Sequence, residues 1–518
     1  MLPKRTGFYY LVLAVLVTIS FGLALRFAFW RDDWGFFWGA YNNDRSLLTY
    51  LFHPGTIAEF VLMSKLVGSN VVWWNAGGLI LKLLASISVY RFFRLLTKSE
   101  RTGKIAGLLF ATTPVGLESV GWSAAHVVLL DVLFTSWACI YVLLYLEKKQ
   151  LRDLIYAVLF TGFALLSDFV RESPIFVIYF LFIVLYHPEI QIQKLKKIGI
   201  ALGVAAVSVF GFLMVANFHM FMATRIMEAI VRHGWDIMFY IRKSFLAFSV
   251  FFTSVGNMDI GWLVGSRDAV GFSDPSMWMV LAGMVPGLAI VYLLRKHTKQ
   301  KNAILLLSWM YLFCIPNWIF NIITTPGYTN RYLVLSSVGY VGLLAVVLSS
   351  VRHDTLRRIL FGILLIVQMG ITISVHKTYE TFRSETIFEQ LTSRMDQDVP
   401  KKEKQYLFLV TGDAPGLKDG LFMSGQMPYV NKRDIKTREG FPVFADSLDT
   451  ALSYLCGTVA THSAVLERVA IVQPLSISDV YAWRITGHLD VVSVHDQTRE
   501  LLNKRMGDGE CTKPSVVQ

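Results

Sequence analysis

Long apolar runs dominate the first three quarters of the chain. A helix needs roughly 20 apolar residues to cross a bilayer. About eleven segments approach or exceed that length. They cover residues 8–29, 71–95, 105–115, 127–146, 154–167, 175–186, 198–218, 277–294, 304–323, 332–349 and 359–375. The three shortest fit spans that are buried in protein or line a cavity. The pattern predicts an α-helical polytopic membrane protein with about eleven spans.

The first apolar run follows Lys4 and Arg5 and continues without a small-residue cleavage site. A secretory signal has a shorter apolar region that ends at such a site. We therefore expect the run to be retained as the first membrane helix.

Positive charge orients these predicted spans. Alternate loops between them are rich in lysine and arginine, for example Arg91 to Lys104 and Arg295 to Lys301. Basic loops stay in the cytoplasm, so we expect a cytoplasmic N-terminus. The run 237–252 contains Arg242 and Lys243 and would reverse this order if it spanned. We interpret it as an interfacial or re-entrant helix, which leaves the C-terminus extracytoplasmic.

The chain changes character near residue 376, where charges and turn residues return. We predict a membrane domain over 1–375 and a small soluble α/β domain over 376–518, with short buried strands at 406–410, 469–472 and 490–494. Cys456 and Cys511 could pair if this domain faces an oxidising compartment. The domain could bind glycan, contact an acceptor or pack on the outer loops.

Composition agrees with this arrangement. Of 518 residues, 54% are hydrophobic and only 17% are charged. Mean hydropathy is +0.50. Basic cytoplasmic loops account for the net charge of +12, so it does not indicate a nucleic-acid partner. Membrane lipid is the expected surrounding.

Two adjacent carboxylates, Asp32 and Asp33, follow the first predicted span and lie between Trp30 and Trp34. They could cap an interfacial helix flanked by belt aromatics. They could equally supply a general base or a ligand to a divalent cation, because paired carboxylates are enriched at functional sites.

Three further polar clusters fall on the same predicted side. The first contains Glu118, Trp122 and His126, the second contains Arg171 and Glu172, and the third contains Arg331. The charged residues of each cluster could instead cap a helix or form a local ion pair. For His126 the pattern favours an interfacial histidine over a catalytic one. An arginine there could also bind phosphate through its fork of donors.

Lys82 falls inside a predicted span. An intramembrane charge is costly, so we expect Lys82 to face the bundle interior with an acidic partner.

The order of these motifs resembles a known family. The acidic pair is followed by Phe52-His53-Pro54, by Pro114, Glu118 and Trp122, by Arg171-Glu172-Ser173-Pro174, and by Arg331-Tyr332-Leu333. This order is similar to that of the GT-C superfamily of polyprenyl-phosphate-sugar-dependent glycosyltransferases, especially its protein O-mannosyltransferase-like branch. The likeness covers residues 8–349. That branch often has Arg-Pro in place of His53-Pro54 and Ser-Lys-Glu in place of Val170-Arg171-Glu172.

The resemblance implies an active site at the outer membrane surface, a lipid-phosphate sugar donor and inverting transfer. Asp32 or Asp33 would be the catalytic base. Glu118 would support it as an acid or metal ligand. The remaining residues implied to contact substrate or phosphate are His53, Arg171, Glu172, Arg331 and Tyr332. A divalent cation such as Mg²⁺ or Mn²⁺ is optional in the family, and Asp33 is its candidate ligand.

The expected function is therefore transfer of a sugar, with mannose as the candidate, to a protein or glycan acceptor. The main alternative is a lipid-linked-sugar flippase or transporter, although no internal repeat of the kind common in transporters is found. An oligosaccharide polymerase or ligase and a non-catalytic scaffold are further alternatives.

Overall fold

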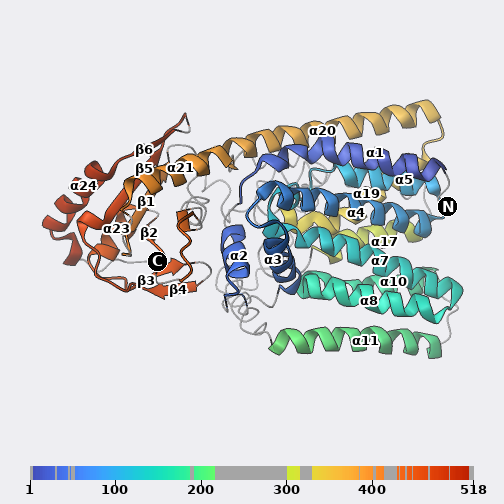
Figure 1. Ribbon diagram of the computed structural model, residues 1–518. Helices are drawn as coiled ribbons and strands as arrows, with labels where there is room; N and C mark the ends of the chain where they lie inside the picture. Colours follow the sequence, from blue (N-terminus) through green and yellow to red (C-terminus); the bar gives the residue numbers. More distant parts are fainter. Residues whose placement is uncertain are drawn as a thin grey trace.

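The fold is taken from a computed structural model of the whole chain (Figure 1). The structure describes residues 4–29, 32–44, 47, 53–186, 192–215, 300–314, 330–383, 385–400, 404–412, 429–430, 432–437, 440–445, 447–464, 467–488 and 490–512.

Helices make up the membrane region. In chain order they are α1 (Lys4–Phe21), η1 (Gly22–Arg26), α2 (Asp32–Tyr41), α3 (Pro54–Val67), α4 (Val71–Thr97), α5 (Glu100–Thr112), α6 (Glu118–Gly121), η3 (Ser123–Ala125), α7 (Val127–Lys148), α8 (Leu151–Ser167), α9 (Phe169–Glu172), α10 (Ile175–Tyr186), α11 (Ile192–Val215), α17 (Gln300–Leu312), η4 (Asn330–Leu333), α19 (Val334–Ser350) and α20 (Asp354–Arg383). The long helices lie side by side in one bundle, while α2 and α3 lie at the end that faces the C-terminal region (Figure 1). We call this the outer end, and the end that bears the N-terminus the inner end.

Five helical segments in the described ranges are long and apolar enough to cross a membrane. They are Gly7–Arg26, Ser123–Lys148, Phe169–Tyr186, Lys197–Met214 and Asp354–Lys377. The predicted spans at 71–95, 105–115, 154–167 and 332–349 are also helical, as α4, α5, α8 and α19. The predicted helices at 237–252 and 277–294 lie outside the described residues. A helical membrane protein is therefore confirmed, whereas the number of about eleven spans stays a prediction.

The sides of the bundle are apolar, as is its interior. Exposed large side chains include Phe8 on α1, Val207 on α11 and Ile366 on α20, which are 68%, 72% and 71% exposed. In water such a surface would cause association, but hydrocarbon solvates it. The main interior cluster is built mainly from α4, α5, α7 and α19, and smaller clusters lie against α1 and α11.

The C-terminal region is built on a small mixed sheet. Its elements are α21 (Glu385–Asp398), β1 (Leu407–Gly412), β2 (Val443–Ala445), α23 (Leu448–Leu455), β3 (Thr461–Ala464), β4 (Glu467–Ala470), η6 (Ile477–Asp479), β5 (Val480–Ile485), β6 (Val491–Ser493), α24 (His495–Gly507) and η7 (Glu510–Thr512). The strand order is β2-β1-β5-β6, with β1 parallel to β2 and β5, and β6 antiparallel to β5. Strands β3 and β4 form a separate hairpin.

Side chains of β1 alternate between two cores. Leu407 and Leu409 pack with α23 and α24. Phe408 and Val410 pack with α21 and with residues of the outer loops. A strand covered on both faces has a continuous apolar run rather than an alternating one. This explains why the run 406–410 predicts the central strand, and the predicted α/β fold is confirmed.

The predicted buried strand at 469–472 is wrong in part. The segment overlaps β4, but Ala470 and Val472 are exposed, and Val472 is 55% exposed. A run rich in β-branched residues indicates a strand but does not show what covers it.

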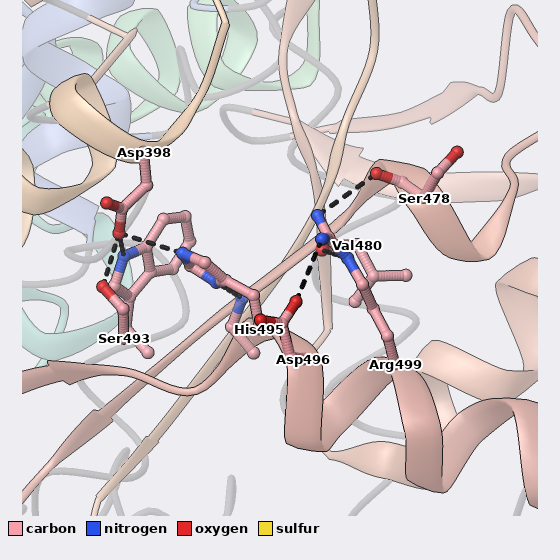
Figure 2. Close-up of polar contacts among 9 residues, drawn as sticks. Asp398, Ser478, Val480, Ser493, His495, Asp496 and Arg499 are labelled. Carbon is pink, nitrogen blue, oxygen red and sulfur yellow. Dashed lines mark hydrogen bonds and ion pairs between the residues drawn. The ribbon is translucent and has the colours of Figure 1, made fainter.

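Asp398 joins α21 to the sheet (Figure 2). Its Oδ2 accepts hydrogen bonds from Trp483 Nε1 at 2.8 Å, Ser493 Oγ at 2.5 Å and His495 Nε2 at 2.9 Å. His495 Nδ1 accepts from the Ala482 N–H at 2.8 Å. The imidazole proton therefore lies on Nε2, and a neutral histidine satisfies both partners.

The C-terminal region packs directly on the outer end of the bundle. Trp38 of α2 donates from Nε1 to the Ile435 carbonyl at 3.0 Å and meets the Phe441 ring with centroids 5.0 Å apart. Trp122 and Ala125 join the same core as α21. Cys456 and Cys511 form a disulfide. The domain boundary at 375/376 stays a prediction, and α20 continues through it.

Candidate active site at the outer end

The segment 113–126 is fitted tightly between helices at the outer end. Gly116 has φ +71°, and a Cβ there would lie 1.8 Å from Val334 Cγ2. On α4, a Cβ at Gly78 would lie 2.2 Å from the Val120 carbonyl oxygen and 2.6 Å from His126 Nε2. Only glycine fits either position, because real Cβ contacts are never that short and the first also has a positive φ. These two glycines therefore fix the place of Glu118 to His126.

Asp33 contacts this segment from α2. It is 1% exposed, and its Oδ1 accepts a hydrogen bond from the Ala124 N–H at 2.7 Å. Asp32 is the first residue of α2. The acidic pair and the segment 118–126 are thus neighbours, although 91 residues separate Asp33 from Ala124.

Glu118 and Arg331 form an ion pair within the same region. Arg331 Nη1 lies 2.9 Å from Glu118 Oε2, and their side chains are 12% and 4% exposed. The guanidinium carbon lies 4.3 Å from the centroid of the Trp122 ring. The carboxylate and the aromatic face together fix the plane of the guanidinium.

A pair that the sequence did not predict is formed by Glu59 and His126. His126 is fully buried, and its Nδ1 lies 2.5 Å from Glu59 Oε1. Its Nε2 lies 3.3 Å from the Val120 carbonyl oxygen, which assigns a proton to that nitrogen. His126 is therefore buried between helices and paired with an acid of α3, while its position at the membrane interface stays a prediction. The one available signal was an acid inside the apolar pattern of residues 57–63.

A second polar group lies at the junction of α7 and α9. Arg171 Nε lies 3.2 Å from Asp168 Oδ2. Glu172 is fully buried and accepts a hydrogen bond from the Thr135 hydroxyl. Asp131, one turn before Thr135 on α7, is within electrostatic range of these charged side chains. Three carboxyl groups thus surround one guanidinium.

Within the described residues, one oxygen each of Asp131 and Glu172 is buried without a hydrogen-bond partner. Buried polar groups are nearly always paired, so such exceptions call for an explanation.

The remaining predicted site residues are placed less fully. His53 precedes α3 at its N-cap, is partly buried, and its carbonyl accepts from the Ile57 N–H at 3.2 Å. Tyr332 lies in η4, next to Arg331.

The described residues do not fit a divalent-cation site, because no group of three or more acidic, histidine or cysteine side chains among them could hold a metal ion. Asp33 accepts a backbone N–H and Glu118 pairs with Arg331, so we derive no step through a metal.

The expectation of an acidic partner for Lys82 is wrong for the described part of the chain. Lys82 is 1% exposed, as expected for the bundle interior. Its ammonium lies 4.2 Å from the Phe110 ring centroid and 5.1 Å from that of Phe21. The negative faces of the two rings replace a carboxylate.

Residues 57–221 match the family model described as dolichyl-phosphate-mannose-protein mannosyltransferase. The expected GT-C resemblance is confirmed. The matched segment contains Glu59, Glu118, His126 and the Asp168–Glu172 group, but not Asp33 or Arg331. The match supports a membrane glycosyltransferase.

Two solved structures are also similar. The oligosaccharyltransferase of Archaeoglobus fulgidus, solved with a tethered acceptor peptide that contains the NVT sequon, has 12% identity and a TM-score of 0.45. The match covers 82% of this chain, which spans only 62% of the length of the oligosaccharyltransferase. ArnT from Cupriavidus metallidurans, in the apo state, has 13% identity and a TM-score of 0.44, with 90% of this chain and 97% of that chain covered. No curated protein sequence matches the chain significantly.

Proposed function

We propose that this protein is an inverting membrane glycosyltransferase that moves a sugar, with mannose as the candidate, from a polyprenyl-phosphate donor to a protein or glycan acceptor. The single observation that carries the proposal is that one buried segment, 118–126, contacts Asp33 from α2, Glu59 from α3 and Arg331 from η4. Acids of α2 and α3, a histidine and an arginine thus converge at the outer end.

The acidic pair would supply the general base. The acceptor hydroxyl must lose its proton as it attacks the sugar, and a carboxylate within hydrogen-bond reach can take it. The Ala124 N–H orients the Asp33 carboxylate, while Asp32 starts the same helix. We propose that one of the two is the base and that its neighbour positions it.

The arginines would stabilise the departing lipid phosphate. Negative charge gathers on that phosphate as the sugar leaves, and donors placed in advance stabilise it most. Arg331 has five N–H donors, and its ion pair with Glu118 holds them in one orientation. Arg171, held by Asp168, is the second candidate, and His53, Glu172 and Tyr332 are proposed to contact donor or acceptor.

Charge and the disulfide support the proposed side of the membrane. Disulfides persist in oxidising compartments, which supports an extracytoplasmic position for the domain that contains Cys456 and Cys511. The basic residues Lys98, Lys104 and Lys149 lie near the inner end, as the positive-inside rule requires of a cytoplasmic face.

The test is transfer of labelled sugar from a polyprenyl-phosphate donor by the purified chain in detergent. Asp32→Asn and Asp33→Asn are compared with wild type, and Asp354→Asn, at the exposed inner end of α20, is the control. We expect at least one of the first two variants to lose transfer while its folded yield is unchanged. Wild-type transfer by both would remove the catalytic assignment.

The same assay separates the alternative function. A flippase or transporter moves its substrate between compartments and forms no new glycosidic bond. A labelled product formed in detergent, where no compartments exist, therefore supports a transferase. Donor binding without any product, in the presence of acceptor peptides and glycans, would favour the alternative.

A further inference from the structure

A cavity of about 530 Å³ lies at the inner end of the bundle, far from the candidate active site. It is bounded by the C-terminal ends of α4 and α19, the start of α5 and α17, and the last turns of α7 and α10. We call it the inner-end cavity. Nothing in the proposed transfer reaction uses it.

Positive charge exceeds negative charge in its lining. Lys98 and Lys301 contribute two ammonium groups, and Glu147 contributes one carboxylate. Lys98 Nζ lies 3.0 Å from Glu147 Oε1. Lys301 Nζ lies 4.7 Å from the centroid of the Tyr186 ring and has no carboxylate partner among the described residues. The lining therefore has a net charge of about +1, which favours an anion.

Two neutral polar groups of the cavity, Asn302 and Ser349, also keep hydrogen-bond donors that can face a ligand. Tyr186 donates its hydroxyl to Asn302 Oδ1 at 2.6 Å, which leaves the Asn302 amide N–H groups to meet a ligand. Thr102 donates its hydroxyl to Ser349 Oγ at 3.1 Å, which leaves the Ser349 hydroxyl proton. Phosphate oxygens accept from ammonium, amide and hydroxyl groups of this kind.

Lys98 has an unusual backbone conformation. It is the C-cap of α4 with φ +53°, a left-handed position where glycine is preferred. A Cβ is disfavoured in this conformation relative to glycine, because it crowds the following carbonyl oxygen. A lysine nevertheless occupies this C-cap position, and it lines the inner-end cavity.

The inner wall of the cavity is apolar. Leu96, Leu143 and Val346 line it and belong to the main bundle core. A soluble anion would leave this apolar surface exposed to water. The glycerol and first methylenes of a lipid can cover it, which is favourable. From this we propose that the inner-end cavity binds the phosphodiester headgroup of an anionic phospholipid.

The experiment measures lipid binding to the purified, delipidated full chain by native mass spectrometry. Phosphatidylglycerol is titrated against the wild type, Lys98→Gln, Lys301→Gln and the double variant, and phosphatidylcholine serves as the zwitterionic lipid. Lys149→Gln is the matched control, because Lys149 also caps a helix at the inner end with a positive φ of 61° but does not line the cavity.

We expect the double variant to bind phosphatidylglycerol about tenfold more weakly, the loss typical of a charge-assisted phosphate contact. Lys149→Gln and the weak phosphatidylcholine binding should remain at wild-type levels. Lys301 is at no strained position, so Lys301→Gln alone tests the proposal if a Lys98 variant folds poorly.

Two results would overturn the proposal. Equal phosphatidylglycerol affinity in the wild type and both lysine variants would remove the site, and an equal loss in Lys149→Gln would assign the binding to general surface charge. A third arm adds inorganic phosphate. Lysine-dependent binding of inorganic phosphate without binding of phosphatidylglycerol would identify a soluble phosphate and exclude the lipid.

Discussion

The carboxylates of the C-terminal region and those of the bundle have different surroundings. Asp398 collects three side-chain donors. Asp479, which is 4% exposed, accepts from Lys404 Nζ at 2.7 Å and from both the N–H and the hydroxyl of Ser476. These groups are satisfied in the way expected of carboxylates that hold a fold together.

In the bundle, several buried carboxyl groups are only partly hydrogen-bonded. Within the described residues, Glu59, Asp131 and Glu172 each keep a buried oxygen without a hydrogen-bond partner. Leaving such a group unpaired costs about 1–3 kcal/mol. A fold selected for stability alone would have replaced these side chains. The contrast fits the proposal that the outer-end acids serve a ligand, whereas the C-terminal carboxylates hold the fold together.

Among the substitutions that test this contrast, Asp131→Asn should produce the largest effect. We expect transfer to fall by roughly 100-fold, the lower range for loss of a group used in proton transfer or charge stabilisation. The melting temperature should stay the same or rise, because a buried unpaired acid is removed. Transfer assays and thermal unfolding of the same preparation measure both effects.

The matched control for that prediction is Asp153→Asn. Asp153 is also buried with an oxygen that has no hydrogen-bond partner, but it lies in the first turn of α8 at the inner end. There a carboxylate complements the helix dipole. Its variant should keep full transfer. Equal activity of the Asp131 variant and wild type would break the contrast.

Asp398→Asn should act in the opposite sense, on stability alone. Replacing a carboxylate that accepts three hydrogen bonds should destabilise the C-terminal region by about 1–3 kcal/mol. Hydrogen exchange of the β5 and β6 amides across a denaturant series measures the change, because these strands lie beside Asp398. Asp496→Asn, whose side chain is 98% exposed on the neighbouring helix, should change stability by less than about 0.5 kcal/mol.

Acid should weaken the C-terminal region in a defined range. Burial raises the pKa of Asp398, but hydrogen bonds from Ser493, Trp483 and His495 outweigh it and hold the pKa below its ordinary value of 3.8. The pKa of Asp479 is lowered in the same way, chiefly by Lys404 against the effect of burial.

Because the unfolded state takes up these protons first, the stabilisation is complete above about pH 4 and is lost as pH falls through the lower folded values. Denaturation midpoints between pH 6 and 2 test this. The Asp398→Asn variant should show a shallower decline, and an equal decline would rule out Asp398 as the source.

Lys82→Met should give the smallest effect. Methionine has a similar length and needs no solvation, so we expect the free energy of unfolding to stay within about 1 kcal/mol of wild type or to rise. A loss of several kcal/mol would show that the contact with Phe21 and Phe110 stabilises the bundle strongly. Thermal unfolding in detergent distinguishes these results.

Much of the fold could be predicted because it depends on local pattern. Apolar length alone places α1, α7 and α20, and the continuous run at 406–410 identifies a strand buried on both faces. Burial of the 469–472 segment could not be predicted, because exposure depends on which elements dock over a strand.

The sequence predicted which residue types form the candidate site, but not which of them contact one another. Glu118 and Arg331 are 213 positions apart, and Glu59 and His126 are 67 apart. Such pairs exist only after the short helices have packed across the ends of the long ones. Lys82 shows the same limit, since its contacts are aromatic rings that no local pattern indicates.

Helix α20 runs without interruption for 30 residues, or about 45 Å, from the inner end of the bundle toward the C-terminal region (Figure 1). Gln368 binds it to Thr112 within the bundle, and Glu380 binds it to Arg26 near the outer end. Adding one residue to a helix turns everything beyond it by about 100°. An insertion or deletion in α20 beyond these contacts would therefore rotate the C-terminal region relative to Trp38 by about 100° per residue and also shift it along the helix axis by about 1.5 Å per residue. Because even whole turns would leave this shift, the length of the connector is fixed by the contact at Trp38.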